Sequence, residues 1–304
     1  MRRLLGPLHV TGVFWYRFHR WGVSILPEWG LYFVTAIFTT FFFVALRRIR
    51  RAIASNLEAV LGPCGWWERQ RRIYRTMWVF AWCLSERYER LSLGRRGSAT
   101  LEGEAFWRDA LGGSEGWILI TAHVGHWEVG AMMAPSDNAR HVHVVREEEM
   151  DKRAQELMRK MVANQAEAGL TMHFASHDPM LGTRLIKALR LGDVVAVQGD
   201  RPRAVARSVR AELFGRPIDL PAGPAALARA AGVAMIPVFV FREGRHRSRV
   251  VFRPPIRVAQ DDRDLSRAMG QVAREVETAI RRQPDQWFCF RELWPEKERS
   301  AAGS

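Results

Sequence analysis

The first hydrophobic feature of the chain is a run of 18 residues without a charged side chain, from Trp29 to Leu46. It ends against four arginines, Arg47, Arg48, Arg50 and Arg51. A helix needs about 20 apolar residues to cross a bilayer, so the run lies at the margin of that length. Two interpretations follow. The run is a single spanning helix with the arginines on the cytoplasmic side, or it lies in the interface or inserts at a tilt.

After this run, the pattern changes to a long amphipathic helix and then to alternating strands and helices. Apolar residues spaced among arginines predict a helix from Trp66 to Leu93. Short apolar runs predict strands at Trp117–Thr121, His141–Val145, Thr171–Ala175, Val194–Gln198, Val209–Phe214, Met235–Phe241 and Arg249–Phe252. The helices predicted beside them are Trp127–Met133, Met150–Ala168, Pro179–Leu191, Gly223–Ala231 and Asp264–Arg282.

This alternation predicts an α/β fold with a mixed, mostly parallel sheet flanked by helices. We expect residues 1–60 to form a membrane-associated, anchoring helical segment. We expect residues 61–304 to form one α/β domain.

The charge balance narrows the class of partner. The chain has 46 Lys and Arg against 32 Asp and Glu, a formal net charge of +14. Free use of arginine by a GC-rich genome is one explanation, and a polyanionic partner is the other. The 12 tryptophans suit a membrane interface, whereas the sequence shows no nucleic-acid-binding motif. We therefore expect an anionic membrane lipid as a partner and no nucleic acid.

One strand ends in residues that suit general-base catalysis. His123 follows the apolar run Ile118-Leu119-Ile120, and Glu128 lies five residues further on. If Gly125 lets the chain turn, a glutamate in the next helical turn can reach back to the imidazole. A carboxylate beside a histidine fixes the tautomer of the ring and stabilises its protonated form. A structural hydrogen bond between the two side chains is the alternative.

Other polar residues follow later strands. Asp200 and Arg201 come after the strand at Val194–Gln198, and the carboxyl ends of strands line the crevice in open α/β sheets. Arg146 follows the second strand and is a candidate for binding a phosphate. Gly223 stands just before a helix, where backbone N–H groups can hold an anion. Each of these sites has a purely structural alternative: a turn, a surface ion pair or a packing helix.

The sequence offers little for a metal or another nucleophile. His123 and His126 have a zinc-like spacing, but no third ligand follows at ligand distance. The three cysteines are far apart and match no metal or disulfide pattern, which suits a reduced cytoplasmic compartment. A Gly-x-Ser-x-Gly elbow is not in the sequence. We therefore predict no metal.

The segment from Ala122 to Gly130, Ala-His-Val-Gly-His-Trp-Glu-Val-Gly, resembles the HxxxxE motif of the bacterial lipid A biosynthesis acyltransferase family. The similarity extends over most of the chain. It includes Arg51–Leu57, Glu86, Phe214-Gly215, Leu220–Pro224, Ile236–Val238 and Pro284–Phe288.

The resemblance implies an O-acyltransferase on the cytoplasmic face of the bacterial inner membrane. Such enzymes move a fatty acyl chain from acyl carrier protein or coenzyme A to a hydroxyl of a glycolipid, such as a lipid A precursor of lipopolysaccharide. It implies His123 as general base and Glu128 as its orienting partner. By position, Arg146, Asp200, Arg201 and Gly223 are substrate-binding candidates. No cofactor or metal is implied, because the acyl thioester is a co-substrate.

The chain also departs from the family pattern. Val124 and His126 stand where the family commonly has Phe and Asn, and Arg146–Asp151 is unusually acidic. The acceptor therefore stays open between a lipid A precursor and another lipid, such as a phosphatidylinositol mannoside, a lysophospholipid or an amino-acid lipid. A non-catalytic lipid-binding protein of the same fold is the other alternative.

Overall fold

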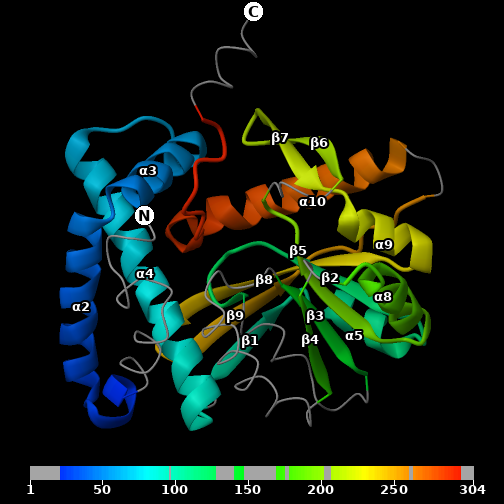
Figure 1. The fold of residues 1–304 in the computed structure, drawn as a ribbon, viewed down its shortest axis with the longest axis horizontal. Helices are drawn as coiled ribbons and strands as arrows, with labels where there is room; N and C mark the ends of the chain where they lie inside the picture. Colours follow the sequence, from blue (N-terminus) through cyan, green and yellow to red (C-terminus); the bar gives the residue numbers. More distant parts are fainter. Residues whose placement is uncertain are drawn as a thin grey trace, which may run out of the picture.

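A seven-stranded sheet forms the centre of the protein in the computed structural model, which describes residues 21–95, 97–127, 140–146, 169–174, 178–201, 207–259 and 263–295 (Figure 1). Its strand order is β1-β9-β8-β2-β5-β3-β4. The strands are β1 (Ser98–Glu102), β2 (Trp117–Thr121), β3 (Val142–Arg146), β4 (Leu170–Phe174), β5 (Val194–Gln198), β8 (Met235–Gly244) and β9 (Arg247–Phe252).

The sheet is mixed and mostly parallel, which confirms the predicted fold class. Strands β8, β2, β5, β3 and β4 run parallel to one another. Strand β9 pairs with β8 in antiparallel fashion, and β1 pairs in parallel with β9. The last two strands at this end of the sheet, β1 and β9, therefore run against the other five.

Helices cover both faces of the sheet. On one face, α8 (Leu181–Arg190), α9 (Gly223–Ala231) and α10 (Arg263–Arg282) pack against Ile118 and Ile120. On the other face, α5 (Glu104–Gly112) packs Trp107 against Trp117 and Leu119. Strand β2 is buried on both sides because successive side chains point to opposite faces. This explains why its sequence reads as a continuous apolar run.

Among the described residues before the sheet, three long helices form a group of their own at one side of the molecule (Figure 1). They are α2 (Glu28–Ala45), α3 (Arg47–Leu61) and α4 (Trp66–Leu93). Helix α4 meets the far end of the β8–β9 hairpin, where Glu86 pairs with Arg242 and the fully buried Glu89 pairs with Arg245. Helix α3 joins the C-terminal segment, because the buried amide of Asn56 bonds three backbone groups there.

Helix α2 carries an exposed apolar stripe. Trp29, Phe33, Ile37, Phe41 and Val44 follow one another at helical spacing and are each more than half exposed. By length and composition, Glu28–Ala45 is long and apolar enough to cross a membrane, and only 17% of it is buried. The hydrophobic run predicted from the sequence is therefore a helix, displaced by one residue.

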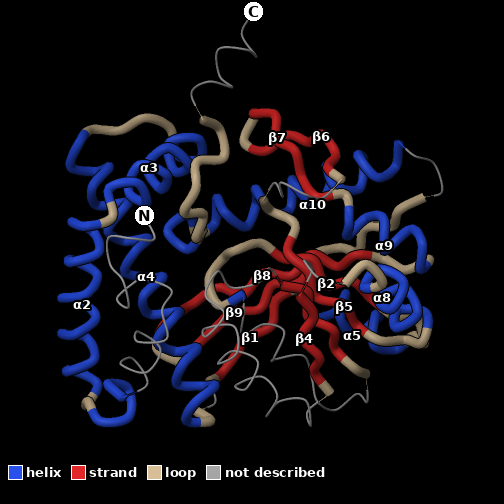
Figure 2. The backbone as a smooth tube through the Cα atoms, in the orientation of Figure 1, coloured by secondary structure: helices blue, strands red, loops and turns tan. Residues whose placement is uncertain are grey.

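A two-stranded hairpin stands apart from the main sheet and contacts α10 (Figure 2). Its strands are β6 (Ser208–Leu213) and β7 (Arg216–Pro221), joined by Phe214 and Gly215, both at positive φ. This is the geometry of a tight hairpin turn. No strand was predicted at Arg216–Pro221, which contains two prolines, but an edge strand tolerates proline.

The predicted elements otherwise differ from the observed ones mainly at their ends. The strand β1, the helix α5 and the short 3₁₀ helix η3 (Pro284–Gln286) were not predicted. The predicted helix Met150–Ala168 lies outside the described residues, as does the predicted helix Trp127–Met133 beyond Trp127. The boundary placed after residue 60 falls in the last turn of α3, and a separate anchoring segment stays a prediction.

Candidate active site

Two adjacent parallel strands bring His123 and Asp200 together. Strand β2 pairs with β5 so that Thr121 faces Gln198. His123 and Asp200 each follow two positions later. The pairing continues past the strands, because the Gly199 N–H donates to the Thr121 carbonyl at 2.9 Å. The carboxyl ends of neighbouring parallel strands are a usual place for a site.

Asp200 holds His123 through two hydrogen bonds. The Nδ1 atom of His123 lies 2.7 Å from Oδ1 of Asp200, and the backbone N–H of His123 donates to Oδ2 at 3.2 Å. Asp200 is 1% exposed, whereas the His123 side chain is 18% exposed. A carboxylate accepts the proton of Nδ1 and leaves the basic lone pair of the ring on Nε2.

The charge of Asp200 is stable at neutral pH. Complete burial raises the pKa of Asp200, but the adjacent His123, with Arg201 behind it, lowers that pKa more strongly. The net shift is downward. An ionised, buried carboxylate against Nδ1 both orients an imidazole and stabilises its protonated form.

The loop after His123 is held by backbone contacts to β8 and to the C-terminal segment. Gly125 has φ +54°, and a Cβ there would lie 2.2 Å from the Val240 carbonyl oxygen. The Gly125 N–H donates to the Gln286 carbonyl, and the Phe288 N–H donates to the His123 carbonyl, both at 2.9 Å. Only glycine fits this close approach at positive φ.

Gln286 extends this clamp with its side chain. It is buried, accepts from the Arg242 N–H at 2.8 Å and donates to the Arg242 carbonyl at 2.8 Å. The amide thus pairs with β8 as a neighbouring strand would. Sequence patterns did not point to this role, because the two residues are 44 positions apart.

His126 turns away from His123 into a buried polar network. Its Nδ1 lies 2.8 Å from the Ser248 hydroxyl, and its Nε2 lies 3.0 Å from the carboxylate of Glu86. Arg242 pairs with the same carboxylate at 2.8 Å. Burial raises the pKa of Glu86, but His126 and Arg242 lower it more. The two loop histidines therefore have different partners, and no cluster of three potential metal ligands occurs within the described ranges.

The remaining candidates lie at different distances from the loop. Arg146 ends β3, and its guanidinium lies 5.7 Å from the ring centre of Trp127, which is 5.1 Å from that of His123. Arg201 donates to the Phe288 carbonyl, and its Nε lies 3.8 Å from Asp200. Gly223 is exposed at the start of α9. Arg146 thus lies against Trp127, the aromatic neighbour of His123, and Arg201 lies beside Asp200, its carboxylate partner.

Glu128, predicted to orient His123, lies outside the described residues, so its role stays a prediction. The structure gives Nδ1 of His123 to Asp200, which the sequence had suggested only as a substrate contact. The available signal was the position of both residues just beyond predicted strands. Local sequence patterns do not show that these two strands, β2 and β5, are neighbours in the sheet.

Comparison with known proteins bears on the family of the chain. The family described as bacterial lipid A biosynthesis acyltransferase matches residues 4–296. A search of curated proteins finds no match. The family match covers nearly the whole chain and confirms the family expected from the HxxxxE segment. The chain therefore belongs to the bacterial lipid A biosynthesis acyltransferase family.

Proposed function

We propose that the protein is an O-acyltransferase of the bacterial inner membrane, acting at its cytoplasmic face. It transfers a fatty acyl chain from an acyl thioester, carried by acyl carrier protein or coenzyme A, to a hydroxyl of a glycolipid such as a lipid A precursor. Membership in an acyltransferase family supports the reaction class. The exposed apolar stripe of α2 supports access to the bilayer.

The observation that carries the proposal is the pairing of His123 Nδ1 with the buried Asp200 at 2.7 Å. With Nδ1 held, Nε2 is the atom assigned to take the proton of the acceptor hydroxyl. The hydroxyl oxygen attacks the thioester carbonyl, and a tetrahedral intermediate forms. Its collapse breaks the carbon–sulfur bond, and the imidazolium returns the proton to the leaving thiolate. The products are an ester and a free thiol.

The other candidate residues receive roles by position. Arg146 lies against Trp127 and Arg201 beside Asp200, and both are assigned to supply positive charge for the oxyanion or for a phosphate of either substrate. Glu128 keeps the role that the HxxxxE motif implies, as a second carboxylate that helps to orient the histidine. Gly223 is assigned an anion contact at the start of α9.

The membrane side of the proposal rests on α2 and on the start of α4. Trp66 and Trp67 are 61% and 81% exposed, and α2 exposes its apolar stripe. Tryptophan favours the boundary between lipid and water. The arginines that open α3 suit the anionic surface of the cytoplasmic leaflet. Both substrates carry long apolar chains, so their reaction needs this access.

A transfer assay tests the proposal. Detergent-solubilised protein receives radiolabelled acyl carrier protein thioester, or acyl-coenzyme A, with a panel of lipid acceptors. Wild type should move label to a glycolipid, and His123→Ala should lose at least about 10³-fold in rate. The control variant His141→Ala should retain activity, because this histidine precedes β3 and its ring is hydrogen-bonded to Thr171. Folded wild type that binds lipid but moves no label from either donor would favour a lipid-binding protein.

A further inference from the structure

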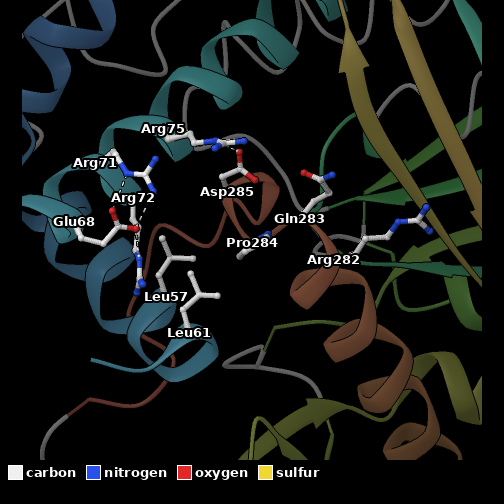
Figure 3. Close-up of a pocket in the computed structure, with 10 residues that line it drawn as sticks. All are labelled: Leu57, Leu61, Glu68, Arg71, Arg72, Arg75, Arg282, Gln283, Pro284 and Asp285. Carbon is white, nitrogen blue, oxygen red and sulfur yellow. Dashed lines mark hydrogen bonds and ion pairs between the residues drawn. The ribbon is translucent and has the colours of Figure 1, made fainter. Parts of the chain in front are cut away.

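A cavity of about 280 Å³ lies where α3, α4 and the end of α10 meet (Figure 3). Leu57 and Leu61 of α3 form its apolar side, and η3 contributes Pro284 and Asp285. The polar side comes from α4. Glu68, Arg71, Arg72 and Arg75 line it at the spacing of a single helix face.

Acidic side chains hold these arginines in place. Glu68 accepts from Arg71 at 2.7 and 3.1 Å and from Arg72 at 3.0 Å. Asp285 accepts from Arg75 at 2.6 Å. Hydrogen bonds from Arg71 and then Arg72 lower the pKa of Glu68 to about 2, so Glu68 keeps its ion pairs with both arginines at neutral pH. The guanidinium groups are therefore arranged before any ligand arrives.

These contacts leave most of the donors unused. Each guanidinium has five N–H groups. The hydrogen bonds use two on Arg71, two on Arg72 (one to the Gly62 carbonyl) and one on Arg75. Three arginines against Glu68 and Asp285 also leave a positive charge. The fourth arginine of the lining, Arg282, points away from the α4 group in Figure 3 and pairs with Glu102.

The surroundings of the cavity indicate where its ligand comes from. Trp66 and Trp67 stand directly before Glu68 on α4 and are among the most exposed large apolar side chains described. Helix α3, which supplies the two leucines, follows the exposed helix α2. A recess with one apolar wall and one guanidinium wall suits the headgroup end of a lipid, because a lipid is charged at its headgroup and apolar in the acyl chains attached to it. A recess of this size is also too small for a folded protein surface to enter.

The cavity is joined to the catalytic loop through η3. Asp285, which binds Arg75, is followed by Gln286, whose carbonyl accepts from the Gly125 N–H at 2.9 Å. Gly125 stands two residues after His123. The α4 arginines are therefore linked through η3 to the loop that carries the proposed base.

We propose that Arg71, Arg72 and Arg75 bind a phosphate group on the headgroup of the lipid acceptor. This inference rests on the proposed function, because it names the chemical class of the acceptor for the same site. Guanidinium forks match phosphate oxygens in two-bond geometry, which a lysine does not provide.

Vesicle binding tests this inference without requiring turnover. The probe is phosphatidylcholine vesicles that contain phosphatidic acid, a phosphomonoester, or cholesteryl hemisuccinate, a carboxylate, at matched surface potential. Wild type should float with phosphatidic acid vesicles at a lower lipid concentration than with cholesteryl hemisuccinate vesicles. Arg71→Gln with Arg75→Gln should reduce this preference by about tenfold or more. Arg108→Gln with Arg267→Gln removes the same charge from exposed helical ion pairs elsewhere and should keep the preference.

A second variant separates geometry from charge. Arg71→Lys with Arg75→Lys keeps both charges and both ion pairs, and it should still lose part of the phosphate preference. The inference fails if the lysine variant binds like wild type, or if the glutamine variant loses affinity for both vesicle types equally. In either case the cavity contributes only a general positive potential. If instead the glutamine variant weakens docking of labelled acyl carrier protein alone, the pocket serves the donor. An inactive wild type that keeps the phosphate preference would reject the proposed reaction and retain the site.

Discussion

Replacing Asp200 by asparagine tests the proposed base most directly, since the change keeps the size of the side chain. In wild type, Oδ1 faces Nδ1 of His123 and Oδ2 accepts its backbone N–H. Asparagine has only one oxygen. If that oxygen keeps the backbone bond, the NH₂ group faces Nδ1 and drives the ring proton to Nε2, where it blocks base catalysis.

The size of the effect follows from this geometry. The variant loses both the correct tautomer and the negative charge that stabilises the imidazolium. Loss of an orienting carboxylate of this kind costs about 10³–10⁴-fold in kcat. At about 1.4 kcal/mol for each factor of ten, the barrier rises by roughly 4 to 5.5 kcal/mol. KM should change little, because Asp200 is 1% exposed and does not reach the substrate.

The assay combines initial rates of acyl transfer with thermal unfolding in the same detergent. Asp219→Asn is the matched control, because that carboxylate is 51% exposed and pairs with Arg210 on the β6–β7 hairpin. We expect the control to match wild type and Asp200→Asn to remain folded but nearly inactive. A folded Asp200→Asn enzyme with kcat within about tenfold of wild type would refute the role given to Asp200.

Three other perturbations examine the loop, the buried network and the membrane face. Gly125→Ala places a Cβ 2.2 Å from the Val240 carbonyl at φ +54°, so the free energy of unfolding should fall by at least about 3 kcal/mol. A urea midpoint like that of wild type would contradict the clash. Glu86→Gln breaks a buried ion pair and should cost about 3 kcal/mol at pH 7. The folded state lowers the pKa of Glu86, so its stabilising effect is present above the unfolded value of about 4.3 and is lost as pH falls through the folded value. A deficit that stays constant from pH 7 to pH 3 would argue against this linkage. Phe33→Ser with Phe41→Ser removes two side chains that are 64% and 54% exposed. At about 2 kcal/mol each, or about 4 kcal/mol together, vesicle affinity should fall by up to roughly 10³-fold without a change in thermal unfolding. Unchanged flotation would exclude this face of α2 from membrane binding.

Strands and helices with strong patterns were predictable because burial imposes those patterns locally. Strand β2 was predicted with its correct bounds, since a strand buried on both faces reads as a continuous apolar run. Strand β1 was missed, because an edge strand with mostly exposed side chains carries no such run. The tight hairpin at Phe214 and Gly215 was hidden by the prolines of β7.

The candidate site was predictable only in part. His123 was singled out because it ends an apolar strand within the HxxxxE segment, and Asp200 was placed at the end of another strand. Which strands are neighbours depends on pairing between segments far apart in the chain, and local patterns do not carry that information. The hydrogen bond from His123 to Asp200 joins residues 77 positions apart. The same reason hid the clamp made by Gln286.

The sequence by itself determined the α/β class, the apolar helix before it, the positive charge and the family, because each depends on residue types or on their order along the chain. The tertiary structure decided the rest. In the folded chain, Asp200 is the residue that bonds Nδ1 of His123, and His126 is buried against Glu86. The α4 arginines line a cavity. These outcomes depend on which strands pair and which helices pack together. Such contacts arise only when the whole chain buries its apolar surface around one sheet.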